Sequence, residues 1–240
     1  MIALVGGDGS IGRRYQAVLN YIKEPYLVIE KDDDPAILGR PDITHAIIAT
    51  PTETHMEWCE RAAHKKIWFL CEKPMSKHRE EIKPLLQKTG FVVNNWAFVS
   101  TNMNNTRANH LSYNFYNTGR DGLVWDVCQL VYLSHLANGI LEVRTDSYEW
   151  TAHWNGVQVP YNFIEASYLQ MVRAFITHDS KRLWSLADAY EMSGLCEEII
   201  KQVGETCEGF VGHSSKKWWE SIPRKSVREN RREASPSVVV

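Results

Sequence analysis

The sequence predicts an α/β fold, with a doubly wound parallel sheet in the N-terminal part and a smaller α+β domain with an antiparallel sheet after it. Short apolar runs alternate with segments of helical spacing over the first 96 residues, which implies parallel strands joined by right-handed crossovers. A glycine-rich turn follows the first apolar run directly. From residue 111 onward the apolar residues alternate singly, and Asn155 and Gly156 form a dipeptide typical of a tight hairpin turn.

The expected elements follow from the spacing of apolar residues. Strands are predicted at 2–5, 26–29, 45–49, 67–71 and 91–93. Helices are predicted at 10–21, 56–64, 77–88, 163–177 and 186–203, while residues 31–41 leave room for a loop only. We divide the chain into a dinucleotide-binding domain at 1–96, a substrate and dimerisation domain at 97–213, and a basic tail at 214–240.

The composition is that of an ordinary globular protein, with 44% hydrophobic residues, 23% charged residues and a formal net charge of −2 over 240 residues. Glutamates interrupt the basic tail, so nucleic acid is not an expected partner. No apolar run is long enough to span a membrane and no leader is evident, so we expect a cytoplasmic protein. The five cysteines form no CxxC pair, so neither disulfides nor a metal site are expected: Cys59, Cys71, Cys128, Cys196 and Cys207.

Three glycines fit the pattern GxGxxG between the first strand and the first helix. Gly7 is expected to allow a tight turn, Gly9 to let a diphosphate approach the backbone, and Gly12 to let helix and strand pack closely. The main-chain N–H groups around Ser10 and Ile11 would then face the phosphate charge at the start of the helix. The turn therefore predicts a binding site for NAD or NADP.

An acidic residue, Glu30, directly follows the second predicted strand, where a carboxylate can accept hydrogen bonds from the hydroxyls of an adenosine ribose. This position favours NAD. The neighbouring basic residues Lys31, Arg13 and Arg14 could instead contact the 2′-phosphate of NADP, so the choice of coenzyme stays open.

Three further segments complete a pattern: IIATPTETH at 47–55, LCEKPM at 70–75 and GLVWD at 122–126. With the glycine turn, they resemble the Gfo/Idh/MocA family of oxidoreductases, whose N-terminal domain has a Rossmann fold. The resemblance implies that two groups of residues border the coenzyme. One lines it along a strand end and the other forms the floor of the cleft: Thr50, Pro51, Thr52 and His55, then Glu72, Lys73 and Pro74.

Many members of that family carry an aspartate and, four residues later, a histidine that acts as acid or base. Asp126 matches the aspartate, but Leu130 stands where the histidine would be, and leucine transfers no proton. Asp126 itself, Tyr132 or His135 could substitute, or Lys73 could act alone. We take Lys73 and Asp126 as the candidate catalytic residues.

The resemblance implies an NAD(P)-dependent oxidoreductase that transfers hydride to or from a sugar, nucleotide sugar or polyol. Two alternatives remain: reduction of a conjugated acceptor, as in biliverdin reductases, and a sensor that binds coenzyme without chemistry because Leu130 replaces the histidine. The resemblance also implies a homodimer, or a higher homo-oligomer, that pairs through the open face of the second sheet.

Overall fold

The first sheet has six strands in the order β10-β5-β4-β3-β1-β2. The structure is a computed structural model that describes residues 1–103, 110–114, 123–144 and 151–203. The strands are β1 (Ile2–Val5), β2 (Tyr26–Ile29), β3 (His45–Ile48), β4 (Trp68–Cys71), β5 (Gly90–Val92) and β10 (Trp184–Ser185). The first five are parallel, and β10 pairs with β5 in the antiparallel direction. The predicted parallel sheet is confirmed.

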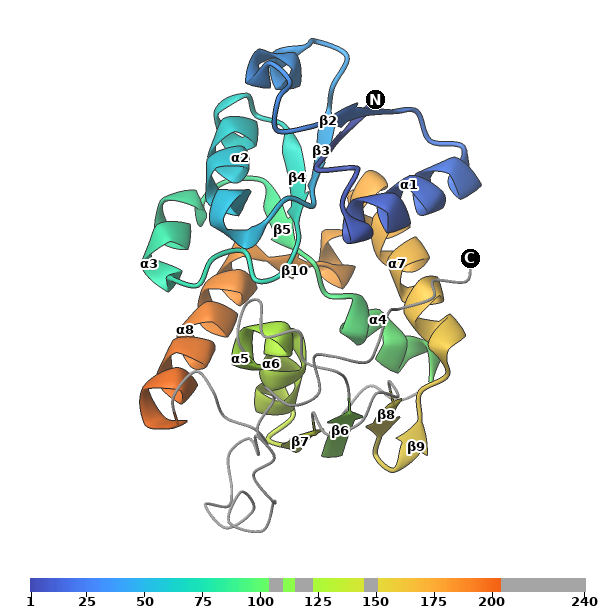
Figure 1. The fold of residues 1–240 in the computed structure, drawn as a ribbon, viewed down its shortest axis with the longest axis vertical. Coiled ribbons are helices and arrows are strands. Elements are labelled where there is room, and N and C mark those ends of the chain that lie inside the picture. Colours follow the sequence, from blue (N-terminus) through green and yellow to red (C-terminus); the bar gives the residue numbers. More distant parts are fainter. Residues whose placement is uncertain (104–109, 115–122, 145–150, 204–240) are drawn as a thin grey trace, which may run out of the picture.

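Helices cover both faces of this sheet (Figure 1). Helix α1 (Ser10–Ile22) and helix α7 (Tyr161–Ile176) lie on one face, and α2 (Thr52–His64) and α3 (Arg79–Ile82) lie on the other. Because both faces are covered, the strands are continuous apolar runs, and Leu4, Ile47 and Leu70 are fully buried. The predicted helix at 77–88 is shorter, since a 3-10 turn, η2 (Lys83–Leu85), follows α3.

The second sheet has four strands in the order β7-β6-β8-β9. They are β6 (His110–Asn114), β7 (Ile140–Arg144), β8 (Thr151–Trp154) and β9 (Val157–Gln158). Asn155 and Gly156 join β8 to β9 with φ angles of 50° and 79°, which confirms the predicted hairpin. The predicted antiparallel sheet is confirmed for the pairs β6–β8 and β8–β9. The pair β6–β7 is parallel, because the helices α5 (Leu123–Asp126) and α6 (Cys128–Leu136) lie between these strands in the chain.

The remaining helices and 3-10 turns pack around the two sheets. Helix α4 (Asn95–Asn102) packs against α7, and α8 (Leu186–Val203) packs against α3 and α6. A 3-10 turn, η3 (Ser180–Arg182), precedes β10, and another, η1 (Pro35–Gly39), occupies the segment predicted to be a plain loop. The Asp34 side chain caps η1 by accepting from the Ala36 N–H. The division of the chain at residues 96 and 213 stays a prediction.

Within the described ranges, no helix combines the length and apolar character needed to cross a membrane. Across the same residues, no group of three or more His, Cys, Asp or Glu side chains is arranged to hold a metal ion. Cys59, Cys71, Cys128 and Cys196 are free thiols in the interior. Cys207, Gly122 and the tail at 214–240 lie outside the described residues.

Candidate active site

The glycine turn connects β1 to α1 at the carboxyl edge of the first sheet. Gly6, rather than Gly7, has the positive φ angle of 82° that forms the tight turn, and a Cβ there would lie 2.9 Å from the Ala49 carbonyl oxygen. A Cβ on Gly12 would overlap the carbonyl oxygen of Gly6, so this glycine allows helix and strand to pack closely. The role expected for Gly7 therefore belongs to Gly6, while that of Gly12 agrees with the prediction.

Gly9 leaves space where a diphosphate would lie. A Cβ on this residue would have no neighbour closer than 3.5 Å. Gly9 is the N-cap of α1, makes no side-chain cap, and is followed by Ser10 and Ile11 in a first turn without acidic residues. Main-chain N–H groups at such a helix start attract anions. The residues present therefore fit a dinucleotide.

Glu30 follows β2 and lies beside the glycine turn. Its Oε1 atom accepts a hydrogen bond from the Asp8 N–H at 2.8 Å, and its own N–H donates to Asp33 Oδ2 at 2.8 Å. The carboxylate is thus held at the edge of the turn. Arg14, by contrast, faces α7, where its Nε lies 3.5 Å from Glu165 Oε1 and its guanidinium 4.9 Å from the Tyr168 ring centre.

The segment after β3 contributes Thr50, Pro51 and Thr52. Pro51 is the N-cap of α2 and Thr52 is its first residue. The Thr50 hydroxyl oxygen is buried and has no hydrogen-bond partner among the described residues. His55 is buried, and its ring nitrogens lie 2.8 Å from the Pro74 and Thr50 carbonyl oxygens. His55 therefore links the segment after β3 to the segment after β4.

The segment after β4 places a buried carboxylate next to a partly exposed lysine. Glu72 is 6% exposed, and its Oε1 accepts from the Tyr15 hydroxyl at 2.8 Å. Its Oε2 accepts from the Lys73 N–H at 3.2 Å. The Lys73 Nζ donates to the Asp126 carbonyl oxygen at 2.7 Å, and a cis peptide bond joins Lys73 to Pro74. Lys73 thus connects the first sheet to α5.

Apart from Lys73, the alternatives to the missing histidine lie in α5 and α6. Leu130 is 2% exposed and packs in the core. The Tyr132 hydroxyl donates to Asp188 Oδ1 at 2.9 Å, and burial, followed by Asp188, raises the pKa of Tyr132 above its usual value. His135 is exposed in the last turn of α6. Val127 separates α5 from α6, so Asp126 and His135 lie on different helices.

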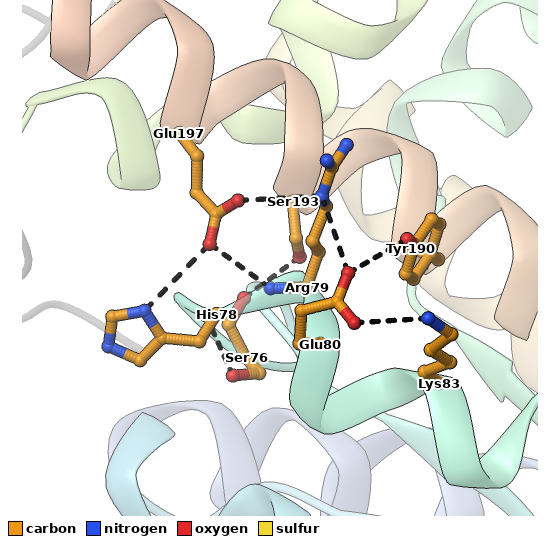
Figure 2. Close-up of polar contacts among 8 residues, drawn as sticks. All are labelled: Ser76, His78, Arg79, Glu80, Lys83, Tyr190, Ser193 and Glu197. Atoms are coloured by element: carbon orange, nitrogen blue, oxygen red, sulfur yellow. Dashed lines mark hydrogen bonds and ion pairs between the residues drawn. The ribbon is translucent and has the colours of Figure 1, made fainter.

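Helix α8 supports the segment that follows Pro74, as Figure 2 shows. The Ser193 hydroxyl donates to the Ser76 carbonyl oxygen at 2.8 Å. Glu197 accepts from the Arg79 N–H at 3.2 Å and lies 3.8 Å from the His78 ring. These contacts join residues more than 115 positions apart in the chain, since the Ser76 and Ser193 pair spans 117. The sequence offers no local signal for them.

The polar residues converge because the strands that carry them are parallel. The glycine turn, Glu30, Thr50 and Lys73 follow β1, β2, β3 and β4, so all lie at one edge of the sheet. The chain reverses its direction of winding between β1 and β3, which is where such sheets bind ligands.

A sequence profile of the Gfo/Idh/MocA family, described as an oxidoreductase family with an NAD-binding Rossmann fold, matches residues 10–90. The chain is therefore similar to this family over residues 10–90.

Solved structures of Gfo/Idh/MocA-type dehydrogenases share the fold over most of the chain. A myo-inositol dehydrogenase from Corynebacterium glutamicum has a TM-score of 0.62 at 13% identity, with 89% of this chain and 99% of that chain covered. The WlbA (WbpB) dehydrogenase from Thermus thermophilus, in complex with NAD and UDP-GlcNAcA, has a TM-score of 0.59 at 14% identity, covering 82% and 94%. GenD2 from gentamicin A biosynthesis, in complex with NAD, has a TM-score of 0.66 at 12% identity, covering 89% and 96%.

No curated protein sequence matches the chain significantly. The predicted resemblance to the Gfo/Idh/MocA family is confirmed for the matched segment, and the similar structures show the fold of the rest. Sequence reasoning did not identify Gly6 or Tyr15. Gly6 lies before the GxGxxG pattern, so the pattern does not include it. Tyr15 occupies a position on the inner face of a helix, where its spacing is that of an ordinary core residue.

Proposed function

We propose that this protein is an NAD-dependent oxidoreductase that transfers hydride to or from a carbon bearing oxygen. A sugar, nucleotide sugar or polyol would supply that carbon. The observation that supports this most is the position of Lys73. This partly exposed residue follows β4 at its carboxyl end, and its Nζ donates to the Asp126 carbonyl oxygen at 2.7 Å. The dehydrogenases of similar fold include one named for myo-inositol and one in complex with NAD and UDP-GlcNAcA.

The coenzyme site consists of the glycine turn, Glu30, and the segments around Thr50 and Lys73. Main-chain N–H groups of Ser10 and Ile11 would face the diphosphate, and Gly9 would leave room for it. The unpartnered Thr50 hydroxyl and the partly exposed Pro51 and Thr52 segment would border the coenzyme. His55 would hold these segments in place and would not contact the coenzyme itself, because both its ring nitrogens already contact main-chain oxygens.

We expect NAD rather than NADP as the coenzyme, because Glu30 would lie beside the adenosine ribose. A carboxylate there accepts hydrogen bonds from the ribose hydroxyls and repels a 2′-phosphate. Arg14 is engaged with Glu165 and Tyr168, and Arg13 donates through Nε to the Asp8 carbonyl oxygen at 2.9 Å. Both arginines thus have partners in the protein.

When bound, the nicotinamide coenzyme supplies the hydride acceptor or donor. Lys73 would hydrogen-bond the substrate oxygen and stabilise its charge during the transfer. Lys73 is also the group that would move the proton, since Leu130 has none to give and Tyr132 is committed to Asp188. The main-chain oxygen of Asp126 would aim the amine, and the Asp126 carboxylate would assist from α5.

Turnover across a panel of substrates tests this proposal. The purified protein is expected to reduce NAD⁺ with at least one inositol, hexose or nucleotide sugar, and not to oxidise NADH with a tetrapyrrole. Saturable NAD⁺ binding with no turnover on any compound would instead favour the coenzyme-binding sensor, which the buried Leu130 suggests. Homodimer formation through the second sheet also remains a proposal, and sedimentation equilibrium would give the mass.

A further inference from the structure

Tyr15 places a hydroxyl group in the interior next to the segment after β4 that contains Glu72 and Lys73. It lies in α1, three residues after the last glycine of the turn, and its side chain is fully buried. Its hydroxyl donates to Glu72 Oε1 at 2.8 Å, across 57 positions of the chain. Tyr15 thus lies about one helix turn after the expected diphosphate site, and its hydroxyl reaches Glu72.

Both oxygens of the Glu72 carboxylate are occupied. Oε1 accepts from Tyr15, and Oε2 accepts from the N–H of Lys73 at 3.2 Å. Burying a carboxylate costs free energy unless its oxygens accept hydrogen bonds. Loss of the Tyr15 donor would therefore cause the Glu72 side chain to shift toward another hydrogen-bond donor. Any such shift changes its contact with the main chain of Lys73.

Tyr15 is suited to remain the donor. Burial, followed by the nearby Glu72, raises the pKa of Tyr15 well above its usual value, so the hydroxyl keeps its proton. The Tyr168 ring of α7 packs edge-on against Tyr15 with ring centres 5.6 Å apart, which restricts the ring from the other side. The hydroxyl therefore has a fixed direction.

We propose that Tyr15 is a positioning residue that sets the orientation of Lys73 through Glu72. The inference rests on the proposed function, because the orientation of Lys73 matters for catalysis only if this amine contacts the substrate. The chain of contacts also couples α1, where the diphosphate would bind, to the amine that would meet the substrate. Tyr15 itself is fully buried and would touch neither ligand.

Labelling of lysines with acetic anhydride, quantified by mass spectrometry, tests this without turnover. In the Tyr15→Phe variant, the Lys73 amine is expected to label several-fold faster, because its hold on the Asp126 carbonyl oxygen weakens. The exposed Lys65 and Lys201 provide internal references. Tyr190→Phe is the control, since it also removes a tyrosine hydroxyl from a carboxylate, that of Glu80 (Figure 2).

Unchanged Lys73 labelling in folded Tyr15→Phe protein would overturn the inference, as would an equal rise at every lysine. In turnover assays the variant should lower kcat with the dissociation constant for NAD⁺ unchanged. If Tyr15→Phe does not fold, Glu72→Gln provides the second variant. The amide oxygen of the glutamine can accept a hydrogen bond from the Tyr15 hydroxyl, but its NH₂ group cannot accept one from the Lys73 N–H. Normal labelling of Lys73 in Glu72→Gln would overturn the inference. Failure of the proposed function would appear separately, as wild-type protein that binds no NAD⁺.

Discussion

The Nζ atom of Lys73 donates a hydrogen bond to the Asp126 carbonyl oxygen, 2.7 Å away. This contact joins the carboxyl edge of the first sheet to α5, and Lys73 is partly exposed. Replacing Lys73 by methionine removes the charge and the donor while keeping much of the side-chain length. We expect the rate of hydride transfer in single-turnover experiments to fall about a hundredfold or more.

The affinity of the Lys73→Met variant for NAD⁺ should change little, because the diphosphate and ribose contacts lie elsewhere. Lys65→Met, at an exposed lysine after α2, is the matched control and should keep the wild-type rate. A Lys73→Met enzyme with wild-type turnover would exclude this amine from catalysis.

The carboxylate of Glu30 is expected to select NAD⁺ over NADP⁺. In Glu30→Ala, loss of hydrogen bonds to the ribose hydroxyls should weaken NAD⁺ binding about tenfold, equivalent to about 1.4 kcal/mol. Asp32→Ala removes an exposed negative charge two residues away and should leave the preference intact. Calorimetric titration with both coenzymes measures the ratio, and tighter binding of NADP⁺ by the wild-type protein would contradict the assignment.

Two glycines of the turn should respond differently to alanine. A Cβ on Gly12 would overlap main-chain oxygens of Gly6 and Gly7, so Gly12→Ala should lower the free energy of unfolding by about 1–3 kcal/mol. A Cβ on Gly9 would meet nothing closer than 3.5 Å, so Gly9→Ala should keep wild-type stability but lose affinity for NAD⁺. Urea unfolding and calorimetry measure the two effects, and normal NAD⁺ binding by Gly9→Ala would move the diphosphate away from the turn.

His45 should make the stability depend on pH in the mildly acid range. Burial, followed by the nearby His178, whose Nε2 lies 3.1 Å from that of His45, lowers the pKa of His45 from 6.5 to about 4. As the pH falls from about 6.5 to about 4, the unfolded chain binds a proton at this residue that the folded protein does not, so stability is lost over that window. Because His45 is partly exposed, we expect the loss to be about 1–2 kcal/mol.

Urea unfolding at pH 7 and pH 5 measures this loss. His45→Gln should reduce the difference between the two pH values, and His64→Gln, at an exposed histidine that ends α2, should not. An undiminished difference in His45→Gln would assign the acid sensitivity to other groups.

The N-terminal part of the fold could be predicted because its signals are local. The apolar runs of β1 to β5 and the turn before α1 each lie within a few residues of sequence, and the hairpin at Asn155 and Gly156 is a dipeptide signal. The parallel pairing of β6 with β7 was missed because residue alternation looks the same in both directions of pairing. Strand β10 was missed because its two residues show no periodicity.

Part of the candidate site could be predicted from the sequence, and part could not. Glu30, Thr50 and Lys73 follow predicted strands, so their convergence could be inferred from parallel pairing alone. The bonds from Tyr15 to Glu72 and from Ser193 to Ser76 join residues 57 and 117 positions apart. They depend on how α1 and α8 pack on the sheet, which no local pattern encodes.

Titration of the purified protein with NAD⁺ in a calorimeter tests the central claim most directly. The geometry of the glycine turn predicts saturable binding of one NAD⁺ per chain, which weakens in Gly9→Ala while the fold is retained. Well-folded wild-type protein that takes up neither NAD⁺ nor NADP⁺ would contradict the account.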